Sequence, residues 1–116
     1  MRILVLSRKR SLYSTRRLRE EGVKLGHKVD VVDPLKCVLH LHGKHPAVLV
    51  NGRPYAAPQS VLPRVGTAGT AYAIAVIRQF ERMKVPVVNS PDAIDRAKNK
   101  LACLQFLAAK GVPVPD

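Results

Sequence analysis

The chain has 116 residues, of which 47% are hydrophobic. This length allows one domain with a core and is too short for two. A net charge of +12, from 20 Lys and Arg against 8 Asp and Glu, favours anionic partners: nucleic acid, nucleotide phosphates or acidic peptides. The first apolar run is too short for a signal peptide or a membrane span, and Cys37 and Cys103 lack CxxC spacing. We therefore expect a cytoplasmic protein without a disulfide framework.

The amino-terminal third predicts a βαβ unit. Residues 2–7, RILVLS, form a short apolar run bounded by charge, which is typical of a buried parallel strand. A helix follows, with Ser11 or Ser14 as its cap and Gly26 as its stop. Its expected inner positions are Leu18, Gly22 and Leu25, and its expected surface ion pairs are Arg16 with Glu20 and Arg17 with Glu21. Residues 27–33, HKVDVVD, alternate as a second strand.

The middle of the chain predicts a small antiparallel excursion over residues 38–56. VLHLH and AVLV are strand-like, and Asn51-Gly52 directly after AVLV is a strong signal for a two-residue hairpin turn. SVLP, residues 60–63, then returns to the main sheet as a buried strand.

The last part predicts a helix, a strand and a final helix. Residues 70–84 have helical periodicity, with an inner face formed by Ala73, Ile74, Ile77 and Phe80. VPVVN at 85–89 reads as another strand, and Ser90-Pro91 is a helix start. The final helix should break near Asn99 and end at Gly111. Its expected core side consists of Ile94, Ala97, Leu101, Leu104 and Leu107, which would also bury the Cys103 thiol.

Alternating strands and helices predict an α/β domain with a mostly parallel sheet, helices on both faces and a small β-hairpin insertion. Ligands of such sheets bind beyond the carboxyl ends of the strands. The groups expected at that edge are Ser7-Arg8, Asp33, Arg64 with Gly66 and Thr67, and Asn89-Ser90. A glycine-bearing loop before a helix lets backbone amides approach an anion, so we expect a cationic crevice there. The alternative is that Gly66 only shapes a connection and Arg64 is a solvated surface charge.

Other motifs leave several hypotheses open. GxGxxG and GxxxxGK[ST] do not occur, so a self-sufficient phosphate-transferring enzyme is not indicated. A zinc site is suggested by His40 and His42 together with Cys37 and His45. Their spacing matches no standard structural zinc pattern, and the alternative is that these histidines are solvated. The basic run from Arg8 to Arg19 could grip phosphates, although Tyr13 is its only aromatic, and a solvated basic face is the alternative.

Three stretches together resemble the amino-terminal domain of the RimK family. They are LSRKRSLYSTRRLREEGVKLGHKVDVVDPLKC, LPRVGTAGTAYAIAVIRQFE and NSPDAIDRAKNKLACLQFLAAKGVPVPD. This family comprises ATP-grasp ligases that add glutamate to the carboxyl terminus of a small-subunit ribosomal protein. The resemblance implies a Rossmann-like pre-ATP-grasp domain over residues 1–116, one wall of a substrate cleft. It also implies that the ATP-grasp domain, which would hold ATP and Mg²⁺, is absent from this chain, so that the chain is inactive alone.

The resemblance also implies roles for individual residues. Lys100 would approach the nucleotide, no residue of this chain would be catalytic, and none would bind metal. The residues that would face the peptide or amino-acid substrate are Ser7, Arg8, Tyr13, Arg64 and Gly66. The chain departs from the family pattern at Lys9-Arg10, Tyr72-Ala73 and Asn99, where the family has Asp-Gly-like, Tyr-Gly and acidic residues. Family relatives that act on an amino-group carrier protein or on deazaflavin cofactors leave the acceptor open.

A second class of function stays open from the sequence. The chain could be a stand-alone basic module that holds RNA or another anionic partner. Such a module would bind RNA with a steep salt dependence, whereas a substrate wall would show a shallow one. A homo-oligomer formed through surfaces meant for other domains is compatible with either reading.

Overall fold

The computed structural model describes residues 1–66 and 69–116. In chain order its elements are β1 (Arg2–Ser7), α1 (Tyr13–Lys24), β2 (Lys28–Val32), the short 3₁₀ turn η1 (Pro34–Lys36), β3 (Cys37–His40), β4 (Ala47–Val50), β5 (Arg53–Pro54), β6 (Ser60–Arg64), α2 (Thr70–Arg82), α3 (Pro91–Lys98) and α4 (Lys100–Ala109). The predicted α/β class is confirmed. Within the described part of the chain, no helix combines the length and apolar content that crossing a bilayer requires.

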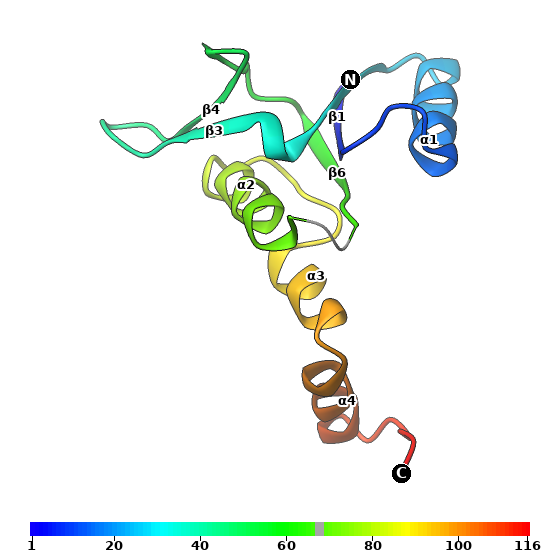
Figure 1. Cartoon of the computed structure of the whole chain (residues 1–116). Helices are drawn as coiled ribbons and strands as arrows, with labels where there is room; N and C mark the ends of the chain where they lie inside the picture. Colours follow the sequence, from blue (N-terminus) through cyan, green and yellow to red (C-terminus); the bar gives the residue numbers. More distant parts are fainter. Residues whose placement is uncertain (67–68) are drawn as a thin grey trace.

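A parallel sheet in the order β2-β1-β6 forms the centre of the domain, with α1 and α2 on opposite faces (Figure 1). Leu4 and Leu6 of β1 are buried in one cluster with Phe80 of α2. The intervening residues of β1 face the other way, because side chains alternate along a strand. On that second face, α1 approaches β2 so closely that a Cβ on Gly22 would lie 2.6 Å from Cγ2 of Val29. Helices therefore cover both faces, as predicted.

The predicted inner face of α2 is confirmed. Ala73, Ile74, Ile77 and Phe80 are all buried. The same helix also supports the second sheet, since the Gln79 side-chain amide donates to the carbonyls of His40 and Ala47, at 3.1 and 3.2 Å. The core therefore extends from the parallel sheet, through α2, to the small antiparallel sheet.

The antiparallel excursion has the predicted form. Strands β3, β4 and β5 pair in sequence order, and the turn between β4 and β5 is Asn51-Gly52. Both turn residues have positive φ, 52° and 74°, as a two-residue hairpin turn of this kind requires.

The helix α1 differs from its prediction in its cap and in its inner face. Neither Ser11 nor Ser14 caps it, because the cap position falls on Leu12 and no side chain accepts a hydrogen bond there. Leu18 and Leu25 are exposed, since Leu25 already lies beyond the last helical residue and the helix meets the sheet through Thr15 and Gly22. The predicted stop is confirmed: Gly26 has φ 88°. The expected ion pairs also form, Arg16 with Glu20 at 4.0 Å and Arg17 with Glu21 at 2.6 Å.

The predicted strand at 85–89 is reduced to a bridge. Val87 pairs with Val61 in parallel fashion, and Val88 N–H donates to the Val61 carbonyl at 3.0 Å. Pro86 has no N–H with which to extend the ladder. The segment still places Asn89 near Arg64, at the carboxyl end of β6.

The final helix is broken at Asn99, as predicted. Of its expected core side, Ile94 in α3 does pack against the core, whereas the positions in α4 do not form part of it. Asn99 caps α4 through its side chain, whose Oδ1 accepts from Ala102 N–H at 3.0 Å. Helix α4 projects away from the sheets (Figure 1), and none of its residues is buried. Leu101 is 66% exposed and Cys103 is only half-buried. This projection gives the chain a radius of gyration of 15.6 Å, against about 13 Å expected for a compact domain of this length.

Candidate functional site

The carboxyl ends of the parallel strands meet at one edge of the sheet. Ser7 is the register partner of Arg64, and Leu6 is the partner of Val32, so Asp33 follows at the same edge. The structure thus brings together the strand-end groups that the sequence places there. Two hollows open at this edge, on either side of the end of β1.

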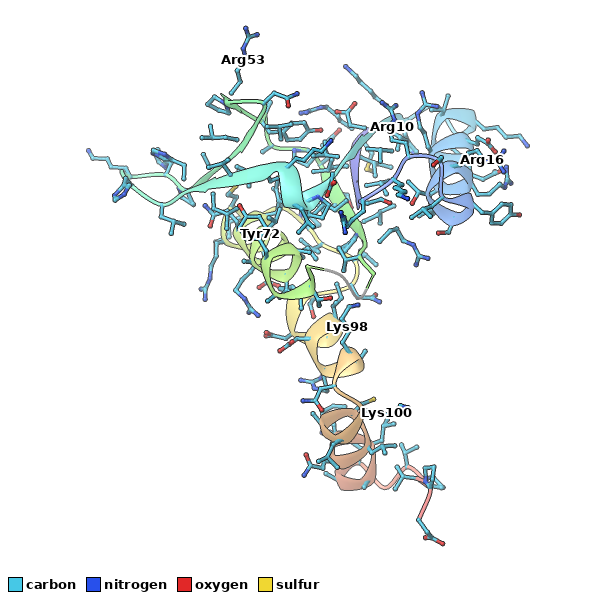
Figure 2. All side chains as sticks on the ribbon, viewed as in Figure 1. Arg10, Arg16, Arg53, Tyr72, Lys98 and Lys100 are labelled. Atoms are coloured by element: carbon cyan, nitrogen blue, oxygen red, sulfur yellow. The ribbon has the colours of Figure 1, made fainter. Side chains whose placement is uncertain are left out.

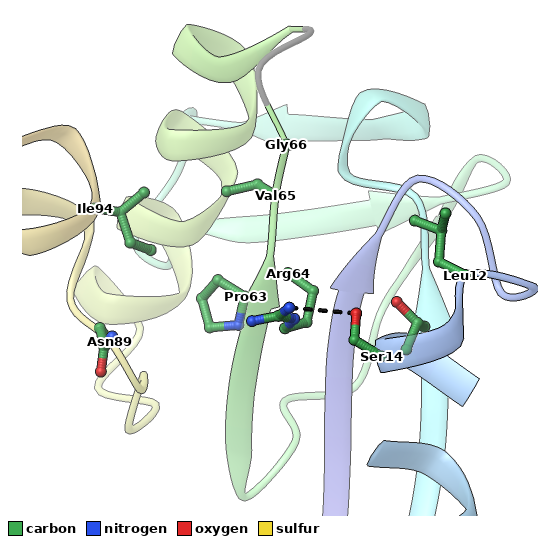
Figure 3. Close-up of a pocket in the computed structure, with 9 residues that line it drawn as sticks. Leu12, Ser14, Pro63, Arg64, Val65, Gly66, Asn89 and Ile94 are labelled. Carbon is green, nitrogen blue, oxygen red and sulfur yellow. Dashed lines mark hydrogen bonds between the residues drawn. The ribbon is translucent and has the colours of Figure 1, made fainter. Parts of the chain in front are cut away.

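The first hollow, the Arg64 hollow, has a volume of about 370 Å³. Its polar lining comes from Ser14, Arg64, Gly66 and Asn89, and Leu12 and Ile94 contribute apolar surface (Figure 3). The Arg64 guanidinium donates through Nη2 to Ser14 Oγ at 3.2 Å, and within residues 1–66 and 69–116 its other N–H groups have no partner and can serve a ligand. The hollow therefore offers a fixed cation beside apolar walls.

The loop after β6 is held from two sides. The Gly66 carbonyl accepts from Lys98 Nζ at 2.7 Å and from Thr70 Oγ1 at 2.9 Å. Lys98 belongs to α3, so this contact connects the end of the sheet to the projecting helices and brings a second cation, an ammonium group, near the hollow. Thr67, expected on this loop, lies outside the described residues.

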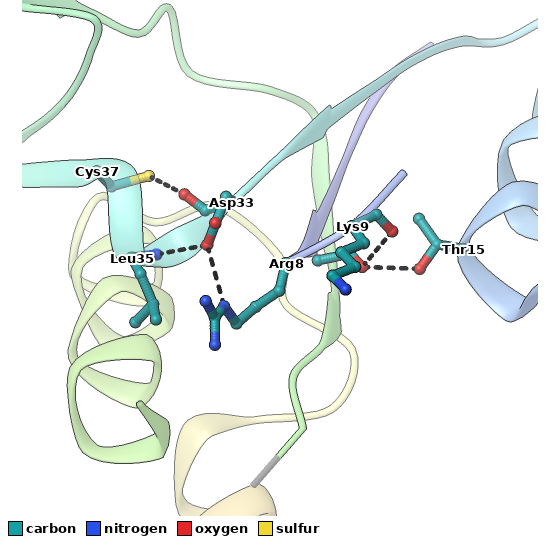
Figure 4. Close-up of polar contacts among 7 residues, drawn as sticks. Arg8, Lys9, Thr15, Asp33, Leu35 and Cys37 are labelled. Atoms are coloured by element: carbon teal, nitrogen blue, oxygen red, sulfur yellow. Dashed lines mark hydrogen bonds and ion pairs between the residues drawn. The ribbon is translucent and has the colours of Figure 1, made fainter. Parts of the chain in front are cut away.

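The second hollow, the Arg8 hollow, has a volume of about 340 Å³. Its charged and polar lining consists of Ser7, Arg8, Arg10, Asp33, Lys36 and Asn51. Arg8 Nε lies 4.0 Å from Asp33 Oδ1, which also accepts from Leu35 N–H at 2.9 Å (Figure 4). Because the Arg8 side chain is 46% exposed, solvent weakens this ion pair, and one carboxylate leaves the three cations of the hollow in excess.

Ser7 is almost fully buried, with 1% exposure. Its hydroxyl donates to the Lys9 carbonyl at 3.2 Å and lies 2.8 Å from Thr15 Oγ1 (Figure 4). Having used its one hydrogen on Lys9, Ser7 accepts from Thr15. These two bonds attach the loop after β1 to α1 at the edge of the sheet.

Neither of the two remaining predicted residues lines these two hollows. Tyr13 is 71% exposed, with the Arg16 guanidinium 5.8 Å from its ring centre, and it lines a neighbouring hollow together with Ser14 and Arg64. Lys100 is exposed on α4, well separated from Arg10 at the sheet edge (Figure 2). The structure therefore gathers Arg64, Gly66 and Asn89 in one hollow, places Ser7 and Arg8 at the other, and leaves Lys100 apart.

The residues of the zinc hypothesis do not gather. The His40 and His42 rings meet edge to face with their centres 6.2 Å apart, whereas the Cys37 thiol donates to the Asp33 carbonyl. Burial, followed by the charge of Asp33, raises the pKa of Cys37 to about 11, so the thiol is protonated at neutral pH. Among the described residues, no three His, Cys, Asp or Glu side chains lie together in a way that could hold Zn²⁺ or Mg²⁺.

Several site residues were not predicted from the sequence. Ser14 is expected from the sequence only as a helix cap, and the sequence analysis assigns no role to Lys98 or Lys36. Their roles depend on which loops meet at the sheet edge, and no local pattern in the sequence reports that. The position of Lys36 had a partial signal, because Asp33-Pro34 directly after a strand marks a turn at the edge of the sheet.

The family model described as RimK PreATP-grasp domain matches residues 1–94. Among curated proteins, the chain is 44% identical over 115 residues to a "Probable alpha-L-glutamate ligase" of Marinomonas sp. (strain MWYL1). It is 47% identical over 115 residues to a protein of the same description from Saccharophagus degradans (strain 2-40 / ATCC 43961 / DSM 17024). Each match covers 99% of this chain and 38% of the relative, so the chain spans well under half the length of these proteins.

Solved structures show the same fold. The ATP-grasp ligase PsnB complexed with minimal precursor matches with a TM-score of 0.73 and 21% identity, over 99% of this chain and 44% of that one. The RimK domain protein ATP-grasp from Sphaerobacter thermophilus DSM 20745 matches with a TM-score of 0.66 and 26% identity, over 100% of this chain and 40% of that one.

Proposed function

The chain belongs to the RimK pre-ATP-grasp domain family, and from this premise we propose that it forms one wall of the substrate cleft of an ATP-dependent glutamate ligase. The proposed reaction joins glutamate to the carboxyl terminus of a small-subunit ribosomal protein. The observation that carries the proposal is the Arg64 hollow, a cationic recess at the carboxyl edge of a parallel sheet. The proposed location is the cytoplasm, where ATP and glutamate are available.

Arg64 has the chemistry to hold the carboxylate that reacts. Its Nη2 group is oriented by Ser14, and the remaining guanidinium donors can make paired hydrogen bonds to two carboxylate oxygens. Such a contact would hold the peptide end in one orientation, which lowers the entropic barrier to attack by the glutamate amine. Leu12 and Ile94 would keep water away from this contact.

Nucleotide and magnesium would be held elsewhere. ATP with Mg²⁺ supplies the activation of the carboxylate in this class of ligase, but the described residues offer no cluster of carboxylates for the metal. We therefore assign nucleotide binding to an ATP-grasp domain that would correspond to the portion of the relatives this chain does not match. The proposed contribution of this chain is limited to binding and orientation.

The projecting helix α4 suits contact with such a second domain. Its Leu101 and Phe106 side chains are exposed, and so is Val112 just after the helix. Lys100 stands at the first turn of α4, where it could reach a nucleotide bound by the neighbouring domain. Tyr13, on the rim near Arg64, would contact the peptide.

The test is an activity assay of a fusion protein. Residues 1–116 would be joined to the portion of the Marinomonas relative that they do not match, and ADP release would be measured with ATP, Mg²⁺, glutamate and a peptide ending like the small-subunit ribosomal protein. The fusion should release ADP only when both substrates are present, and residues 1–116 alone should release none. ADP release that does not depend on glutamate or on the peptide would contradict the proposal.

A further inference from the structure

The Arg8 hollow carries an excess of positive charge that the domain itself does not neutralise. Arg8, Arg10 and Lys36 line it, against a single carboxylate, Asp33. Asp33 Oδ1 is 4.0 Å from Arg8 Nε, and within the described residues neither the Arg10 side chain nor the Lys36 side chain has an ion pair or a hydrogen bond. Two cations whose side chains are unpaired among the described residues, together with Arg8, favour a ligand with more than one negative charge.

The apolar part of this hollow is aliphatic. Val31, Val32 and Val50 line it, and Asn51, on the hairpin turn, contributes a side-chain amide. None of the lining residues is aromatic, so the recess lacks the stacking platform on which nucleic-acid bases are usually held. Valines and cations lining one recess instead suit a glutamate side chain, whose methylene groups can pack on valine while its carboxylate meets Arg or Lys.

The two hollows are adjacent. Ser7 lines the Arg8 hollow, and its register partner Arg64 lines the other. Neighbouring strands lie about 4.8 Å apart, and an extended peptide advances about 3.3 Å per residue. One extended peptide of a few residues can therefore span both hollows.

We propose that the Arg8 hollow is a second anion site, which binds the side-chain carboxylates of an acidic, glutamate-rich peptide through Arg8, Arg10 and Lys36. The identity of the ligand rests on the proposed function: the residue whose carboxylate reacts lies at Arg64, and the acidic residues that precede it lie at the Arg8 hollow. A peptide that already carries added glutamates then binds better than one that carries none.

Binding of fluorescent tetraglutamate to residues 1–116, followed by anisotropy, tests this site. Arg10→Gln combined with Lys36→Gln removes two charges from the hollow. Arg19→Gln combined with Lys24→Gln removes two charges from α1, from residues that line neither hollow. The hollow variant should weaken binding about tenfold or more, and the α1 variant less than about twofold. Circular dichroism checks that both variants keep the fold.

Three results would overturn the site: equal weakening by both double variants, equal affinity for tetraglutamate and tetraglutamine, or tighter binding of an oligouridylate RNA that displaces tetraglutamate. The last would identify phosphate chains as the ligand. Failure of the proposed function is a separate outcome. An inactive fusion protein whose tetraglutamate binding still depends on Arg10 and Lys36 would refute the ligase and retain the site.

Discussion

The guanidinium of Arg64 donates a hydrogen bond to the hydroxyl of Ser14, with 3.2 Å between Nη2 and Oγ. This contact joins the end of β6 to the first turn of α1 across the Arg64 hollow. It uses one N–H group of the guanidinium and leaves the others for a ligand. Ser14 is therefore placed to orient the Arg64 side chain.

Ser14→Ala should therefore raise the KM of the fusion protein for the acceptor peptide by about fivefold, which corresponds to loss of one hydrogen bond worth ~1 kcal/mol. The value of kcat should change little, because Ser14 acts through Arg64. Ser11→Ala, an exposed serine outside the hollow, is the matched control. An unchanged KM in Ser14→Ala would show that Arg64 needs no orientation by this hydroxyl.

Gly22 and Val29 should be energetically coupled. A Cβ at position 22 would lie 2.6 Å from Cγ2 of Val29, and overpacking of this kind costs about 1–3 kcal/mol. The better helix propensity of alanine offsets about 1 kcal/mol of that cost. Gly22→Ala should thus lower the free energy of unfolding, measured with urea, by up to ~2 kcal/mol.

The Val29→Ala background provides the control for this steric explanation. With the valine methyl groups removed, Gly22→Ala should become neutral or stabilising, because only the helix propensity remains. A cost that is the same in both backgrounds would place the strain elsewhere.

The domain should lose stability in alkaline solution for two identifiable reasons. Burial raises the pKa of Cys37 to about 11 from 9.0, and burial with the hydrogen bond to Asp30 raises the pKa of Tyr55 to about 12 from 10.0. Folding therefore favours the protonated form of each group. The resulting stabilisation is complete below the unfolded pKa and is lost as pH rises through the folded pKa.

Thermal melting between pH 8 and pH 12 checks this expectation. The Tm of the native chain should fall in this range, Cys37→Ala should flatten the part between about 9 and 11, and Tyr55→Phe the part between about 10 and 12. Identical pH profiles for the native chain and both variants would contradict it.

Amide hydrogen exchange should separate α4 from α2. None of the α4 residues is buried, whereas Ile77 and Phe80 of α2 are fully buried. Opening α4 disrupts few contacts, so its amides in residues 1–116 should exchange at least about tenfold faster than those of α2. In the fusion protein the α4 amides should slow down if a second domain covers the helix. Equal exchange in both proteins would argue against that contact.

Much of the fold could be predicted because its signals are local. The apolar run of β1, the Asn51-Gly52 turn and the Ser90-Pro91 start each specify an element within a few residues. The periodicity of α4 correctly indicated a helix with apolar residues, but a periodic pattern does not report what covers the apolar face. Leu101 was therefore assigned to a core that this domain does not provide.

The site was predictable only in part. Parallel strands end at one edge, so the meeting of Ser7 with Arg64 followed from the strand order. The division of that edge into two hollows did not follow from the strand order, because it depends on how the loop after β1 is attached to α1 by Ser7 and Thr15. The contact of Lys98 with the Gly66 carbonyl likewise depends on the path of α3, which no local pattern specifies.

The most direct test of the substrate wall is mass spectrometry of the acceptor peptide after incubation with the fusion protein, ATP, Mg²⁺ and glutamate. We predict a product heavier by one or more glutamate residues, with a kcat/KM for Arg64→Gln lower by about tenfold to a hundredfold, as loss of a charged hydrogen bond implies. An acceptor of unchanged mass, or glutamate addition by Arg64→Gln at the native rate, would contradict the account.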